Sequence, residues 1–182
     1  MMRAAIASLF ALLLSASVAH AYRWADPVKP AIPGTSAYVP IPTATVRPQP
    51  ARIYRAVYDA TRAAEKPDQI LPALDMAGSE LNLFAAEHVP FTHVKFAVVF
   101  HGAALDGILD DAHYRAKHGM ANPNLPVIAA MKRAGVEFFV CGQNLAYDQV
   151  DPATLTPDVK LALDALVVLM TYQNTGYALL SF

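Results

Sequence analysis

The sequence predicts an α/β protein with a parallel sheet covered by helices on both faces. Strand-like and helix-like segments alternate from residue 52 onward, and the strand-like segments at 94–102 and 136–141 are apolar almost throughout. Strands buried on both faces have this nearly continuous apolar character. The alternation is typical of crossover connections between parallel strands, so one α/β domain is the expected architecture.

The first strand and the first helix have distinct signals. Residues 52–59 combine β-branched and aromatic side chains, which favours a strand. A long amphipathic helix is expected next, with Asp68 as candidate N-cap and Pro72 in the first turn, where proline is tolerated. Its apolar face is defined by residues at helical spacing: Ile70, Leu74, Ala77, Leu81, Phe84 and His88.

The middle of the chain continues the alternation. A second strand is expected at 94–102, followed by a polar, partly helical segment at 103–120. The next helix opens at Asn122-Pro123-Asn124 and ends at Ala134, because Gly135 occupies the usual position after a helix. The third strand, 136–141, ends at Cys141 and is followed by a glycine turn.

Two interpretations of the last part stay open on the residues alone. Thr156-Pro157-Asp158 favours one helix running to Asn174, whereas the alternation at 159–163 favours a short strand with Asp164 capping a shorter helix. In both cases Gly176 ends the helix, and a last strand follows at 177–182.

The N-terminal 51 residues carry two signals of their own. Arg3, an apolar stretch at 4–14 and small residues ending in Ala19-His20-Ala21 predict a signal peptide over residues 1–21. The apolar stretch is shorter than the roughly 20 residues that span a bilayer. We therefore expect a periplasmic or secreted protein that has no membrane span after cleavage.

A proline-rich arm is expected over residues 22–51, before the domain at 52–182. Seven of the fourteen prolines fall between Pro27 and Pro50, which predicts an extended segment. Either it is a spacer, or its apolar side chains lie on a neighbouring subunit.

Charge and cysteine content restrict the function. The formal net charge is −1 and no basic cluster occurs, which argues against nucleic acid as a partner. Cys141 is the only cysteine. In an exported chain an unpaired cysteine indicates intermolecular pairing or a reactive thiol.

Polar residues at the carboxyl ends of three strands form the candidate site. In open α/β sheets, ligands bind in the crevice beyond these ends. Cys141 is the candidate nucleophile, and His101 and Asp59 end the second and first strands. If residues 144–148 form a helical turn, the backbone amides of the three residues after Cys141 would stabilise a thiolate there. These residues are Gly142, Gln143 and Asn144.

Less specific interpretations compete with this one. In the less specific interpretation, Cys141 is an inert buried side chain, because it follows an aromatic, apolar run. His101 would then be a satisfied strand-end histidine, and Asp59 a turn former. Four other histidines lack the spacing of metal ligands: His88, His93, His113 and His118. No metal or cofactor is therefore assigned. A metal site formed by His101 and Cys141 is an alternative.

The order of four segments resembles the DsrE/DsrF-like (YchN-like) family, and more closely its exported, uncharacterised branch. The segments are Lys95 to Gly102, Asn122-Pro-Asn-Leu-Pro126, Val140-Cys-Gly-Gln143 and Gly176-Tyr-Ala. The resemblance covers about residues 52–182. It implies a three-layer α/β/α fold with a five-stranded parallel sheet and favours the short fourth strand near 159–163.

The resemblance also implies a function. Better-understood cytoplasmic relatives carry sulfane sulfur as a persulfide on a cysteine after the third strand, a position that Cys141 matches. This chain differs from them in its signal peptide, in a shorter loop after the cysteine, and in showing no relay partner. We therefore expect a sulfurtransferase-like carrier, a trimer or hexamer, that exchanges sulfur with small donors or thiol acceptors. The alternative is a non-catalytic oligomeric module that binds a small ligand or a metal.

Overall fold

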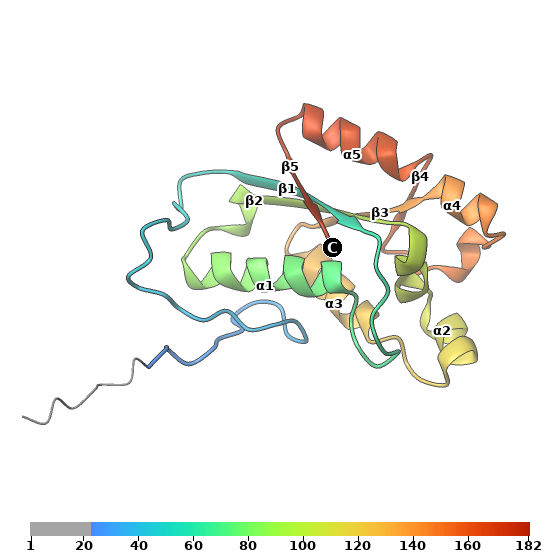
Figure 1. Ribbon diagram of the computed structural model, residues 1–182, viewed down its shortest axis with the longest axis horizontal. Helices are drawn as coiled ribbons and strands as arrows, with labels where there is room; N and C mark the ends of the chain where they lie inside the picture. Colours follow the sequence, from blue (N-terminus) through green and yellow to red (C-terminus); the bar gives the residue numbers. More distant parts are fainter. Residues whose placement is uncertain (1–22) are drawn as a thin grey trace, which may run out of the picture.

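A five-stranded parallel sheet forms the centre of the computed structural model, which describes residues 23–182 (Figure 1). The strand order is β4-β3-β2-β1-β5, and every paired strand is parallel to its neighbour. The strands are β1 (Tyr54–Ala60), β2 (Val94–Phe100), β3 (Glu137–Cys141), β4 (Lys160–Ala162) and β5 (Ala178–Ser181). The predicted α/β architecture is confirmed, including the short fourth strand. The predicted signal peptide lies outside the described residues.

Helices cover both faces of the sheet. The long helices α1 (Pro72–Ala86) and α3 (Asn124–Arg133) pack on one face, and α5 (Ala165–Asn174) crosses the other face from the β4 edge to the β5 edge (Figure 1). Two shorter helices, α2 (Asp111–His118) and α4 (Gly142–Tyr147), lie near the carboxyl ends of the strands. No helix among the described residues is long and apolar enough to cross a membrane.

The two faces of the sheet have separate apolar cores. The larger core lies against α1 and α3 and includes Tyr58, Phe100 and Phe138. The smaller core lies under α5. Its buried strand residues alternate along the strands with those of the larger core: Val57, Ala97, Val99 and Cys141. This separation follows from the two-residue period of a strand, which sends successive side chains to opposite faces.

The start of α1 differs from the prediction. The helix begins at Pro72 with Leu71 as N-cap, so Asp68 is not the cap. Asn124, at the start of α3, accepts a 2.8 Å hydrogen bond from the Leu71 amide through its side-chain oxygen. A residue distant in the sequence therefore satisfies this donor, and local sequence cannot reveal it. The predicted end of α3 is confirmed, because Gly135 has a φ of +96° just beyond the last turn.

The proline-rich arm packs on its own domain. Ile32 and Thr35 are each only 1% exposed, and the arm closes on itself through an antiparallel bridge between Val28 and Tyr38. Asn82 of α1 accepts hydrogen bonds from the amides of Ala31 and Ile32. We had expected a spacer or an arm over a neighbouring subunit. Instead, the middle of the arm extends the core that covers α1.

Candidate functional site

The carboxyl ends of β1, β2 and β3 lie side by side because these strands are neighbours in the sheet. Ala60 pairs with Phe100, and Phe100 with Val140. One further step in this register places His101 beside Cys141. Asp59 lies on the same face of the sheet as both, since alternate residues share a face. The structure therefore brings the three sequence-predicted strand-end residues to one edge, under the end of α5.

His101 is held by Asp59. The Nε2 atom of His101 lies 2.6 Å from Oδ1 of Asp59, and both side chains are largely buried. A carboxylate oxygen accepts hydrogen bonds, so Nε2 is the ring atom that donates to Asp59, and Nδ1 is left for another partner. Ser181 of β5 adds a long 3.5 Å contact to the other carboxylate oxygen. This pair fixes the imidazole at the end of β2.

Cys141 is a buried free thiol. It is 6% exposed and belongs to the smaller core, where its apolar neighbours include Val99 and, from α5, Val168. It faces away from Phe138, whose side chain lies in the larger core on the other face. Helix α5 therefore packs over the thiol.

The helix after Cys141 starts earlier than predicted. We expected a turn at residues 144–148, but α4 spans Gly142–Tyr147 and Cys141 is its N-cap. The Cys141 side chain accepts no capping hydrogen bond from the first turn. The three predicted supporting residues therefore lie where expected in the chain, directly after the sulfur, without an amide bonded to it.

The supporting residues instead hold α4 in place. Asn144 accepts a hydrogen bond from the Gly102 amide and donates one to Asp148. Gln143 donates a long 3.4 Å hydrogen bond to the Leu163 carbonyl. These contacts connect the ends of β2 and β4 to the helix that follows β3. The bond from Gly102 to Asn144 was not foreseen, because it joins residues 42 positions apart.

Gly142 is required by close packing. A Cβ at this position would lie 2.6 Å from the carbonyl oxygen of Ala162, which is backbone and cannot rotate away. We predict that Gly142→Ala lowers the free energy of unfolding by about 1–3 kcal/mol, as overpacking does. Urea unfolding followed by circular dichroism measures this. The control is Tyr147→Ala in the same helix, where the side chain is 89% exposed and makes no hydrogen bond with any described residue. Equal stability of the two variants would contradict the packing argument.

Metal binding has no geometric support in the part of the chain that is described. No three side chains of the metal-binding types converge among residues 23–182. His101 is engaged with Asp59, and Cys141 is enclosed by apolar side chains. What the site contains is a buried thiol whose residue neighbours, by strand register, a carboxylate-held imidazole, and no hydrogen bond joins the sulfur to the ring among the described residues.

The cover over the site was missed by the sequence analysis. Three α5 residues pack in the smaller core with Cys141: Ala165, Val168 and Leu169. Residues 165–170 are apolar without interruption, which predicts a helix with a buried side, but the sequence does not assign that helix to the face that holds Cys141.

The fold and the site define an α/β protein with a lone cysteine at the end of the third strand of a five-stranded parallel sheet. The family model described as "DsrE/DsrF-like family" matches residues 53–182. The chain belongs to the DsrE/DsrF-like family.

Two solved structures share this fold. The protein of unknown function MTH1491 from Methanobacterium thermoautotrophicum is 19% identical, with a TM-score of 0.52, and the match covers 71% of this chain and 99% of that one. The ychN protein from E. coli is 15% identical, with a TM-score of 0.50 and coverage of 71% and 100%. The comparison with functionally curated proteins found no match. At these identities the two structures support the fold alone.

Proposed function

We propose that this protein is an exported, sulfurtransferase-like sulfur carrier that holds sulfane sulfur as a persulfide on Cys141. The observation that carries the proposal is the register that sets Cys141 beside His101, whose ring is held by Asp59. Family membership supports it, since the DsrE-like family is associated with sulfur relay. The predicted signal peptide supports a periplasmic or secreted location.

The proposed chemistry uses the chain's own groups. Nδ1 of His101 takes the thiol proton, and Asp59 stabilises the resulting imidazolium. The Cys141 thiolate then attacks a sulfane sulfur of a polysulfide. A new S–S bond forms on Cys141, and the shortened polysulfide leaves with the electrons of the broken S–S bond. In delivery, a small thiolate attacks the outer sulfur and Cys141 leaves as thiolate, so no external oxidant is needed.

Access to the thiol is part of the proposal. The α5 helix packs in the smaller core with Cys141 through Ala165, Val168 and Leu169. Displacing this single helix exposes less apolar surface than opening the larger core, so we infer that sulfur donors enter when α5 lifts. Intact-mass measurement after exposure to polysulfide is the test. We expect a gain of one sulfur that dithiothreitol removes, whereas an unchanged mass would refute the proposal.

The burial of Cys141 favours one alternative. Cys141 is 6% exposed and lies in an apolar cluster, and an inert core cysteine has the same surroundings. In that case the protein is a non-catalytic oligomeric module that binds a small ligand, because the described residues give no support for a metal. The same mass measurement separates the two functions, because only the carrier gains a reducible sulfur.

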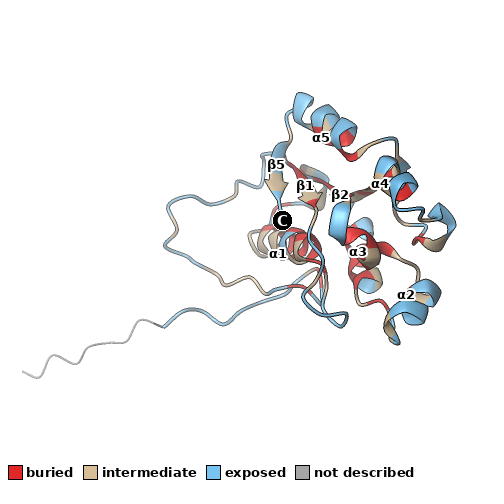
Figure 2. Ribbon diagram, turned by 45° about the vertical axis from the view of Figure 1, so that its right-hand side comes forward, coloured by how far each residue is buried: buried red, intermediate tan, exposed pale blue. Residues whose placement is uncertain are grey.

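We further propose that the chain forms a homo-oligomer through the outer face of α5 (Figure 2). Large apolar side chains are exposed there and on the adjoining end of β4, a density that usually marks an interface. They are Leu161 (60% exposed), Leu163 (76%), Leu166 (59%), Val167 (47%) and Met170 (55%). Such a contact would also control how far α5 can lift.

The oligomer can be tested on this face. We predict that the purified protein is a trimer or larger at micromolar concentration by light scattering, and that Leu166→Glu with Met170→Glu yields monomers. The control is Val46→Glu, which also places a carboxylate at an exposed apolar side chain, but on the arm. A monomeric wild-type protein, or dissociation by the control as well, would contradict this interface.

A further inference from the structure

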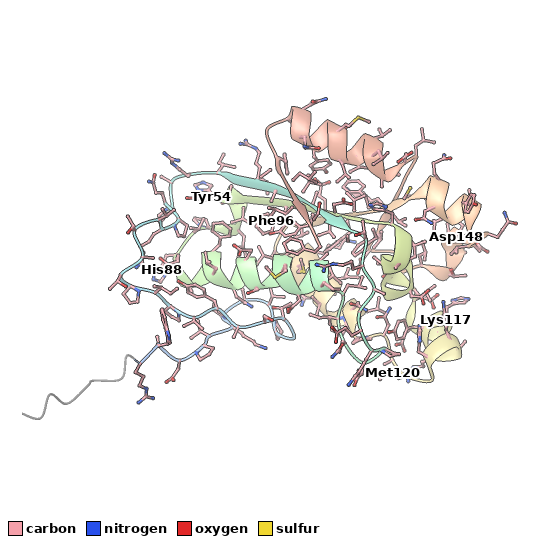
Figure 3. The ribbon with its side chains drawn as sticks, in the orientation of Figure 1. Tyr54, His88, Phe96, Lys117, Met120 and Asp148 are labelled. Atoms are coloured by element: carbon pink, nitrogen blue, oxygen red, sulfur yellow. The ribbon has the colours of Figure 1, made fainter. Side chains whose placement is uncertain are left out.

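A second cavity lies on the opposite face of the sheet from Cys141. It has a volume of about 310 Å³ and opens between α1 and the β1–β5 edge. Aromatic rings form most of its wall: Tyr54, Tyr58, Phe84, Phe96 and Phe182. Figure 3 shows Tyr54 and Phe96 between the sheet and α1. The cavity is separated from the thiol by the sheet itself, so it belongs to a different site.

The aromatic rings are fixed by one another. The Tyr58 ring is 5.2 Å from that of Phe96 in an edge-on arrangement, and 6.0 Å from that of Phe182 in a stacked one. The Tyr54 and Phe84 centroids are 4.8 Å apart. Rings that support each other in this way keep their positions without a ligand, so the cavity is preformed.

Two polar groups on the wall are left without partners. The hydroxyl of Tyr58 is fully buried, and none of the described residues offers it a hydrogen bond. Glu80 of α1 is half-buried in the same wall, and it forms no hydrogen bond or ion pair with any described residue. Buried polar groups are normally paired, and each exception requires an explanation.

The electrostatics select one kind of ligand. Glu80 is the only carboxylate of the wall, and aromatic faces attract cations. Arg55 also lines the cavity, but on β1 its side chain alternates with those of Tyr54 and Ala56, and its charge acts on Tyr177. No cation among the described residues therefore neutralises Glu80.

We propose that this cavity binds a small organic cation with an apolar body. The rings enclose the apolar part, and Glu80 pairs with the ammonium group. This site is independent of the sulfur chemistry proposed for Cys141.

Three probes of similar size test the charge preference. They are phenethylammonium, neutral 2-phenylethanol and anionic 3-phenylpropionate, titrated into the purified protein at pH 7 and followed by calorimetry and amide NMR shifts. We expect saturable binding of the cation, at least about tenfold tighter than that of the alcohol, and no binding of the anion. Equal binding of cation and alcohol, or shifts located away from α1 and β1, would overturn the proposal.

Variants separate the roles of the wall. Glu80→Gln should weaken phenethylammonium about tenfold and leave 2-phenylethanol unchanged, whereas Met76→Trp at the exposed rim should block both. The control is Glu65→Gln, which removes the same charge from an exposed position outside this cavity. An equal loss of affinity in the control and in Glu80→Gln would show only long-range charge and would overturn the proposal.

The Glu80→Gln variant should be at least as stable as the wild-type protein. Burial raises the pKa of Glu80, and Tyr58 is the titratable group that it acts on across the wall. A raised carboxyl pKa means that the folded protein holds the proton more tightly than the unfolded chain, so stability falls as pH rises toward neutrality. Glu80→Gln has no such charge, so its urea midpoint at pH 7 should equal or exceed that of wild type. A variant that folds well and binds poorly identifies Glu80 as a ligand-binding residue.

Discussion

Replacing Cys141 by serine is expected to abolish sulfur uptake completely. Serine has nearly the same volume, but its hydroxyl cannot form a persulfide. We expect no mass gain from polysulfide, no transfer to cyanide and no alkylation by iodoacetamide, because Cys141 is the only thiol in the chain. Far-ultraviolet circular dichroism should be unchanged. Cys141→Ala provides a second variant, since a serine hydroxyl in the smaller core costs about 1–3 kcal/mol if it stays unpaired.

His101 provides the control that separates thiol activation from thiol presence. His101→Ala retains the sulfur but removes the base, so alkylation at pH 6 should slow at least about tenfold. Asp59→Asn should slow it in the same direction, because the ring loses the carboxylate that holds it. If wild-type Cys141 alkylates no faster than a model thiol and gains no sulfur, the carrier function is refuted. The non-catalytic binding module is then the function that the site supports.

Replacing Asn82 by alanine is expected to cause the largest loss of stability. The Asn82 side chain is fully buried, accepts from the amides of Ala31 and Ile32 at 3.0 and 2.8 Å, and donates to Ile32 and Thr35 at 3.1 and 3.2 Å. Alanine would leave several of these groups buried and unpaired, each at about 1–3 kcal/mol. We predict a loss of roughly 3 kcal/mol and a fall in Tm of about 10 °C.

The matched control is Asn174→Ala, at the exposed end of α5. This residue makes no hydrogen bond through its side chain to any described residue, so stability should change little. Limited proteolysis gives a second measurement, because Asn82→Ala should release the arm from α1 and expose the bonds near Ile32 to cleavage. Equal melting of the two variants would show that the arm contributes nothing to the domain.

Most of the sheet could be predicted from the sequence because its signals are local. Strands β2 and β3 are mostly apolar runs, β1 is marked by aromatic and β-branched side chains, and Gly135 marks the end of α3 as predicted. The cap of α1 could not be predicted, because Asn124 reaches the Leu71 amide only after the chain has folded. The short strand β4 has only three residues, and its assignment depended on the family resemblance.

The candidate site was predictable only in part. Placing Asp59, His101 and Cys141 at one edge required only that the strands be parallel and that their ends align. The pair of Asp59 with His101 follows from adjacent strands. The cover of Cys141 by α5 depends on which face the last crossover takes, and no residue near Cys141 carries that information. The cavity beside Glu80 depends on side-chain packing between four segments that are distant in the sequence.

The path of the last crossover has a consequence for the order in which the chain folds. Helix α5 follows β4 at one edge, and β5 follows α5 at the other, so the face that contains Cys141 is closed by the last elements in the sequence. Strands β1, β2 and β3 with α1 and α3 can assemble before them. A nascent or refolding chain therefore presents its thiol to the surroundings until α5 docks. The cysteine is most open to oxidants and sulfur donors in this interval, before the domain is complete.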